Sequence, residues 1–458
     1  MFKIRQSKYR HIFCDQPKTE LCYTGFRVAT TTGETQYIKA STKYWAVAMF
    51  GGGGPLVVGR HDRPGRFEDG TSPILKGHHG SVLDMEWSPF DDSLLATGSE
   101  DSTIKLWSIP DDWEPTDERG LGKEGSHISE SMIDLEGHDK RVTLMRFHPT
   151  ASNTMLSTSA DHTVKVWDVE AGEAITSLDG EISDLSQDIV WDVRGDKYVL
   201  SNKDKAIRFV DPRTGAVISK LEKAHEGSKS VKLSFLGESG KLLSTGSTKQ
   251  SGRELKIWDL KKMDKPLHSE TIDTASGALM PLYDQDTSVL YLCGKGDGII
   301  RLYEFENKEP YLHKLNDGFR STTPGKGYCT VPKRGLNIMN CETTRIMKLT
   351  NTDGIHPLHF TVPRKSDAFQ DDIFPPTAAP TPAHSCEQWF KGSSKLPKTM
   401  KLDPNSMSGG GSKGPAAGKR VSIRSLPTLS KEVDALKKHV AYLEGKLKAA
   451  KISYDPMK

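Results

Sequence analysis

The chain contains two histidine–aspartate pairs in which the same number of residues separates the histidine from the aspartate. A carboxylate beside an imidazole is a common general acid–base arrangement. In each copy a tryptophan follows the aspartate, again at one spacing. The two sets are His78, Asp101 and Trp107, and His138, Asp161 and Trp167. Because the set repeats, we interpret it as structural, with the aspartate of a tight turn hydrogen-bonded to a buried histidine.

The segments around these residues predict the elements that position them. Each copy reads as Gly-His, a short apolar strand, a turn with aspartate, and an alternating strand that ends in tryptophan. Weaker copies end at 205–211, 254–259 and 297–304. Their ends follow Trp167 at steps of about 43, 48 and 45 residues, close to the length of a WD-repeat blade. The longer step from Trp107 to Trp167 indicates an inserted surface loop at 111–131.

These repeats predict an all-β fold, a seven-bladed WD-repeat β-propeller. Strand-like segments at 37–50, 327–341 and 356–362 supply divergent blades at both ends. We expect the ring to span roughly 30–350, within a domain of residues 1–362 that begins with a basic segment. The flanks should complete the ring and pack across one face.

The composition changes after the ring. Residues 363–390 should form an extension packed on the propeller, and residues 391–429 are basic and rich in Gly, Ser and Pro, which predicts a flexible linker. The linker is either a solvated tether or a segment that touches an acidic surface.

A C-terminal α-helical coiled coil is predicted at 430–452, with Ser430 as N-cap. Apolar residues alternate at steps of three and four, the a/d seam of a heptad repeat. They are Val433, Leu436, Val440, Leu443, Leu447 and Ala450. Packing back on the propeller is the alternative, but the strict period and the preceding linker favour self-association, which should depend on concentration.

Several functional classes are not favoured. The net charge of +3 argues against a nucleic-acid binder, and no apolar run predicts a membrane-spanning helix. The six cysteines form no CxxC pair, so neither a zinc site nor a disulfide framework is expected. The glycines at 51–54 lack the Gly-Lys-Ser/Thr of a phosphate-binding loop and read as a turn. We therefore predict a non-enzymatic protein with no cofactor, and expect it in the cytoplasm.

Four segments resemble the coronin family: 5–13 with Cys22, Tyr23 and Arg27, then 287–297, 332–336 and, most specifically, 361–375. This resemblance implies a propeller that binds filamentous actin and a coiled coil that makes the molecule multivalent. The implied role is to crosslink or bundle filaments at the actin cytoskeleton of the cell cortex and so regulate actin dynamics and cell motility. A second implied partner is the branched-actin nucleating complex.

By resemblance, Arg27 is the expected actin-binding residue, since a guanidinium suits a carboxylate-rich filament surface. Arg5, Lys8 and Arg10 are expected to extend the basic patch. In the coil, Val440, Leu443 and Glu444 fit a family pattern that favours a parallel trimer, but His439 occupies its arginine position. Dimer, trimer and antiparallel tetramer stay open. The alternative function is a WD-repeat scaffold for a non-actin complex.

Overall fold

The computed structural model describes residues 6–67, 73–111, 113, 127–352, 354–402 and 404. These residues belong to one compact unit, Met1–Val421. Arg5 and the predicted coiled coil at 430–452 lie outside the described residues.

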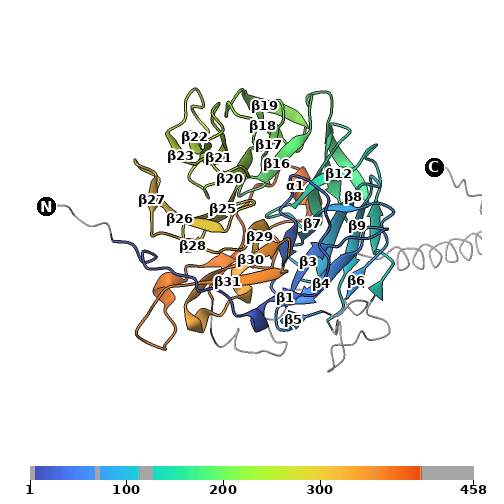
Figure 1. The fold of residues 1–458 in the computed structure, drawn as a ribbon. Coiled ribbons are helices and arrows are strands. Elements are labelled where there is room, and N and C mark those ends of the chain that lie inside the picture. Colours follow the sequence, from blue (N-terminus) through green and yellow to red (C-terminus); the bar gives the residue numbers. More distant parts are fainter. Residues whose placement is uncertain are drawn as a thin grey trace, which may run out of the picture. The chain divides into compact units, whose positions relative to one another are not determined.

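Within the described residues, seven sheets form the seven blades of a β-propeller, as predicted (Figure 1). The first strand of each blade contacts the first strand of its neighbours, so these strands line the central axis. They are β2 (Ile38–Ala40), β7 (Val82–Trp87), β12 (Val142–Phe147), β16 (Ser186–Trp191), β20 (Lys232–Phe235), β24 (Leu279–Asp284) and β29 (Gly325–Thr330).

The second strands lie inside each blade. They are β3 (Tyr44–Ala48), β8 (Leu94–Ser99), β13 (Thr154–Ser159), β17 (Tyr198–Asn202), β21 (Lys241–Ser247), β25 (Val289–Gly294) and β30 (Glu342–Thr350). In β8, β13 and β25 every residue is buried, because neighbouring blades cover both faces of the strand. Their near-continuous apolar and small-polar sequences follow from this burial.

The third strands are β4 (Leu56–Arg60), β9 (Ile104–Ser108), β14 (Val164–Asp168), β18 (Ile207–Asp211), β22 (Arg253–Asp259), β26 (Ile299–Phe305) and β31 (Ile355–Thr361). The outer strands are β6 (Ile74–Leu75), β11 (Ile133–Leu135), β15 (Glu173–Leu178), β19 (Ala216–Leu221), β23 (His268–Asp273), β27 (Leu312–Lys314) and β1 (Tyr23–Thr24). Exposure alternates along β19, as expected of an edge strand with one face in water.

The last blade closes the ring with strands from both ends of the chain. Its β1 pairs antiparallel with β31, where Tyr23 lies opposite Ile355. Phe13 forms a bridge with Thr361 at the other end of β31. Three short strands complete the sheets: β5 (Gly65–Arg66) beside β1, β10 (His127–Ile128) beside β6, and β28 (Phe319–Arg320) beside β26. β10 falls in the segment that we predicted as a surface loop, so that loop adds a strand to the first blade.

The two faces of the ring differ. We call the face with the turns between second and third strands, such as residues 49–55 and 100–103, the turn face. The opposite face carries the loops between first and second strands, and the segment after β31 packs there: Ala383 N donates to Thr150 O at 2.8 Å and Ser152 N to His384 O at 3.0 Å. We call it the extension face.

The extension contains β32 (Thr377–Ala378), β33 (Thr399–Met400) and the helix α1 (Cys386–Phe390), which begins with a capping box between Ser385 and Gln388. Four short 3-10 helices, η1 (Thr19–Leu21), η2 (Lys333–Gly335), η3 (Ile338–Asn340) and η4 (Asp371–Ile373), complete the described elements. β33 pairs with β32, so the packed segment continues into the range predicted as linker, which begins at residue 391.

Candidate functional site

The histidine–aspartate pairs hold strands together. Nδ1 of His78 lies 2.9 Å from Asp101 Oδ2, and its Nε2 lies 2.8 Å from the Thr97 hydroxyl, which also accepts from Trp107 Nε1 at 2.8 Å. The His78 side chain is fully buried. Its two ring nitrogens are thus occupied by groups of the same blade, in agreement with the structural interpretation.

The second pair repeats this geometry, with His138 Nδ1 3.0 Å from Asp161 and Nε2 2.7 Å from Ser157. Burial lowers the pKa of His138, so the ring is neutral at neutral pH. Burial alone would raise the pKa of Asp161, but hydrogen bonds from Thr163 bring it to about 2. A neutral imidazole fixed against a carboxylate that stays ionised serves as a brace between strands.

A third set of this kind was not predicted from the sequence. In the fifth blade His225 Nδ1 lies 2.8 Å from Glu254, and Ser244 joins the ring to Trp258. Glutamate here replaces the turn aspartate and stands on the strand β22 itself, so the spacing that marks the first two copies does not find it. Only the final tryptophan of this repeat was visible as a signal.

Arg27 lies on the turn face, in the link between β1 and β2, and its backbone is fixed. Val28 forms a bridge with Met49, and Phe50 N donates to Arg27 O at 2.9 Å. The preceding ring of Phe26 packs against Trp45, with centroids 5.6 Å apart. These contacts hold the arginine backbone to the first blade.

The Arg27 side chain itself is exposed. Within the described residues, no hydrogen bond or ion pair involves its guanidinium. An arginine on a fixed backbone with free donors is suited to a bidentate contact with a carboxylate of a partner, because few protein contacts must be given up first. The proposed role of Arg27 in binding stays a prediction.

Of the other predicted basic residues, the structure describes Lys8 and Arg10 and does not bring them to Arg27. Lys8 Nζ donates to Asp372 O at 2.9 Å, and the neighbouring Tyr9 hydroxyl donates to Ile373 O. This N-terminal segment joins the last blade at the Thr361 end of β31, whereas Arg27 follows β1, which pairs at the Ile355 end. From the rise per residue of a strand, these two ends of β31 are about 20 Å apart. Lys8 therefore helps to hold the extension, and Arg10 is exposed near it.

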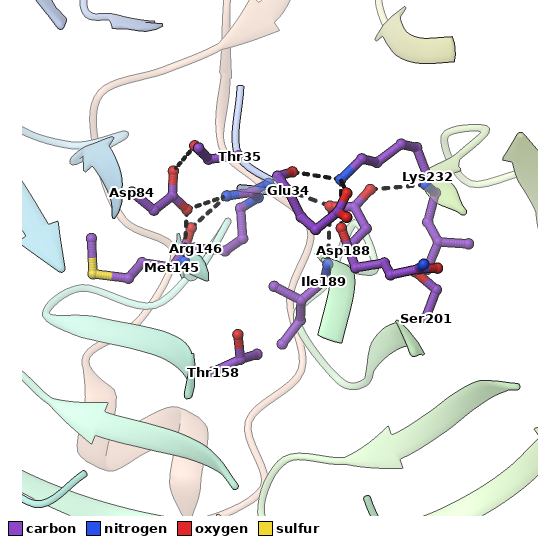
Figure 2. Close-up of polar contacts among 12 residues, drawn as sticks. Glu34, Thr35, Asp84, Met145, Arg146, Thr158, Asp188, Ile189, Ser201 and Lys232 are labelled. Carbon is purple, nitrogen blue, oxygen red and sulfur yellow. Dashed lines mark hydrogen bonds and ion pairs between the residues drawn. The ribbon is translucent and has the colours of Figure 1, made fainter. Parts of the chain in front are cut away.

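A buried polar network ties the Arg27 link to the inner ring of strands (Figure 2). Thr35 donates to Asp84 on β7 at 2.5 Å, and Glu34 pairs with Lys232 on β20 at 3.2 Å. Arg146 on β12 bridges Asp84 at 3.2 Å and Asp188 of the neighbouring blade at 3.5 Å. The link after Arg27 is therefore anchored on two sides of the central axis.

The charges of this network are compensated where they are buried, as such groups must be. Burial alone would lower the pKa of Arg146, but the nearby carboxylate of Asp84 raises it. Burial alone would raise the pKa of Glu34, but the ammonium of Lys232 lowers it, so both side chains stay ionised. A cavity of about 280 Å³ opens beside Glu34, between Lys229, Lys232 and Lys295. Each of these lysines already donates to a carbonyl or hydroxyl oxygen of the propeller.

The predicted oligomerisation residues lie outside the described residues. They are Val433, Leu436, Val440, Leu443, Glu444 and Leu447. Among the residues that the structure does describe, no cluster of three His, Cys, Asp or Glu is arranged to hold a metal ion, and the six cysteines are free thiols. No helix in this part of the chain is both long and apolar enough to cross a bilayer.

Three family models match the chain. A WD domain, G-beta repeat, matches residues 71–108 and 129–168, and a type of WD40 repeat matches 355–397. A domain of unknown function, DUF1899, matches residues 2–66, which include Arg27 and the closing strand β1.

Curated relatives match most of the chain. A coronin-like protein crn1 of Schizosaccharomyces pombe is 36% identical over 404 residues, 87% of this chain and 64% of the relative. Human coronin-2A is 36% identical over 409 residues, 88% of this chain and 75% of the relative. The chain thus spans just under two thirds of the yeast protein's length and three quarters of the human one's.

Solved structures agree with the fold. The WD40 domain of a Toxoplasma gondii coronin superposes with a TM-score of 0.79 at 32% identity, covering 86% of this chain and 98% of that domain. A chain of the mitotic checkpoint complex superposes with a TM-score of 0.55 at 14% identity, covering 74% of this chain and 90% of the other, which speaks for the fold alone.

Proposed function

The chain belongs to the coronin family, and from this premise we propose that it binds actin filaments through the turn face of its propeller. Arg27 is the contact that we assign, and the observation that supports it is an exposed guanidinium on a fixed backbone, with no partner among the described residues. The extension packs on the opposite face, so the described part of the extension does not cover Arg27.

We further propose that the coiled coil predicted at 430–452 joins several molecules, so that the oligomer bundles filaments through its several propellers. A weak contact repeated in one oligomer gains avidity because the second contact forms at high effective concentration. The basic residues after the extension add a salt-sensitive attraction to an acidic filament. On this proposal the protein is a non-enzymatic, cytoplasmic component of the actin cytoskeleton, and the branched-actin nucleating complex is a second candidate partner.

Cosedimentation with filamentous actin at two salt concentrations tests the contact. Arg27→Asp should weaken binding by at least about 30-fold, since breaking a charge-paired contact costs roughly 2 kcal/mol or more. Arg10→Asp is the comparison variant, because it reverses another exposed arginine, at the other end of the last blade, that was predicted to extend the basic patch. A loss in Arg27→Asp alone would confine the contact to Arg27, whereas equal loss in both variants would count against a specific role of Arg27. No binding by the unmodified chain would favour the WD-repeat scaffold for a non-actin complex.

Deleting residues 430–458 tests the second proposal. The shortened chain should be monomeric by light scattering, bind filaments weakly and leave them unbundled in low-speed sedimentation. Bundling that persists at the level of the full chain would contradict the role of the helix.

A further inference from the structure

We propose that Phe50 is an apolar anchor of the filament contact, inserted into a nonpolar pocket of the filament beside the carboxylate that Arg27 binds. The inference rests on the proposed function and names a second residue of the same interface. It follows from the register of two short segments, the exposure of one ring and the shape of one glycine turn.

The register places Arg27 and Phe50 directly opposite each other. The bridge joins Val28 to Met49, and the flanking hydrogen bonds run from Phe50 N to Arg27 O and from Ala29 N to Ala48 O, both 2.9 Å. In such an antiparallel pair, opposite residues project to the same side with Cβ atoms about 5 Å apart. The guanidinium and the ring therefore leave the backbone side by side.

The alternation between neighbours decides which side that is. Val28 and Met49 pack against the core cluster that contains Trp45 and Tyr23. Because side chains alternate along a strand, the residues next to them face away from this core. Arg27 and Phe50 are accordingly both exposed, and the exposed fraction of Phe50 is 61%.

An exposed phenylalanine alone is no evidence of a binding site. Phe50 differs in its surroundings, because its backbone is fixed by the Arg27 hydrogen bond and its neighbour is an exposed arginine without a partner among the described residues. Arginine is among the residue types most enriched in the energetic centres of protein interfaces, and phenylalanine is enriched in interfaces relative to the rest of the surface. A rigid backbone also lowers the entropy lost when these side chains are immobilised.

The glycine turn after Phe50 keeps the approach to this pair open. Gly54 has a φ of +57°, and a Cβ there would lie 2.3 Å from the carbonyl oxygen of Gly80, so the turn is pressed against the next blade. Among the residues that the structure describes, none lies within 4 Å of a Cβ position at Gly52. The side chain of Lys76 lies next to Gly53 and is exposed, which adds a second cation.

We call Arg27, Phe50, Gly52 and Lys76 the glycine-turn patch. It combines an exposed aromatic ring with two exposed cations and a glycine that carries no side chain. The complementary surface is a nonpolar pocket with carboxylates at its rim, which is the chemistry that we assign to the site on the filament.

The test is cosedimentation of Phe50→Ala with filamentous actin, with Ile218→Ala as the matched control. Ile218 has the same exposed fraction, 61%, but lies on the outer strand β19 of the fourth blade. We expect Phe50→Ala to weaken binding about tenfold or more, Ile218→Ala to leave it unchanged, and Phe50→Trp to retain it. All three should unfold at the midpoint of the unmodified chain, because the substituted side chains are exposed.

Salt dependence separates the two residues. Phe50→Ala should shift affinity equally at both salt concentrations, whereas Arg27→Asp should reduce the salt dependence, since of these two side chains only the arginine is charged. If Arg27→Asp loses binding while Phe50→Ala binds like Ile218→Ala, the anchor is refuted and the proposed function stands. If the unmodified chain does not bind filaments, the proposed function fails first.

Discussion

Replacing Trp389 by alanine should release the extension from the propeller. The ring is fully buried between His148, at 4.7 Å between centroids, and Trp191, at 6.0 Å. Its Nε1 donates to Gly195 O at 3.0 Å, and the guanidinium of Arg213 lies 5.0 Å from the ring centroid. These partners all belong to the third and fourth blades, so this one side chain carries much of the docking.

The magnitude follows from these contacts. Removing a buried tryptophan costs about 3–5 kcal/mol in transfer and cavity terms. The lost hydrogen bond adds only about 1 kcal/mol, since Gly195 O keeps a second contact with His148 Nε2 at 3.1 Å and is not left unpaired. We expect docking of the extension to weaken by about 4 kcal/mol, which raises its open fraction about a thousandfold.

The thiol of Cys386, one turn before Trp389 in α1, reports this opening. Burial raises its pKa to about 12, so it is protected while the extension is docked. The rate at which a thiol reagent labels Cys386, measured by mass spectrometry, should rise about 100- to 1000-fold in Trp389→Ala. The matched control is Phe390→Ala, whose ring is 40% exposed and should change the rate less than about threefold. Equal rates in both variants would refute the reasoning.

Three further outcomes are expected. Burial lowers the pKa of His148 to about 3 and that of His61 to about 4. The folded state therefore binds fewer protons than the unfolded state below about pH 6.5, so the free energy of unfolding falls on acidification, by about 2 kcal/mol for each ring at pH 5. His148→Gln should reduce the drop in the urea midpoint between pH 7.5 and pH 5. Asp161→Ala should lower the free energy of unfolding by about 3 kcal/mol, because buried His138 loses its charged acceptor; an unchanged urea midpoint would contradict this. Glu254→Ala should destabilise similarly if the fifth-blade set is an equivalent brace, and a thermal melt within experimental error of the unmodified chain would count against that equivalence.

Much of the ring could be predicted because its signals are local. A turn aspartate, a buried histidine and a strand-ending tryptophan are fixed by contacts within one blade, so His78 and Asp101 mark a blade wherever they recur. The fifth blade shows the limit: Glu254 reaches His225 from a different backbone position, and no fixed spacing encodes that substitution.

Contacts between distant segments were less visible. Lys8 was predicted as part of a basic surface patch, and no spacing in the sequence indicates that its ammonium also donates to the carbonyl of Asp372, 364 residues further along the chain. β33 lies in the segment whose Gly, Ser and Pro content predicted a linker, and its pairing with β32 of the extension outweighs that composition. Phe50 carries no sequence signal of its own; only the register opposite Arg27 distinguishes it.

The closing blade has a consequence for synthesis. Tyr23 cannot pair with Ile355 until the ribosome has made both, and at about 5–20 residues per second that takes roughly 20 to 70 s. During this interval the growing chain is an open stack of blades in which β1 can pair with β5 but not yet with β31, and unpaired strand edges invite association with other chains. Newly made chains are therefore most vulnerable before residues 355–361 emerge, which makes the rate of late elongation a determinant of the yield of folded protein.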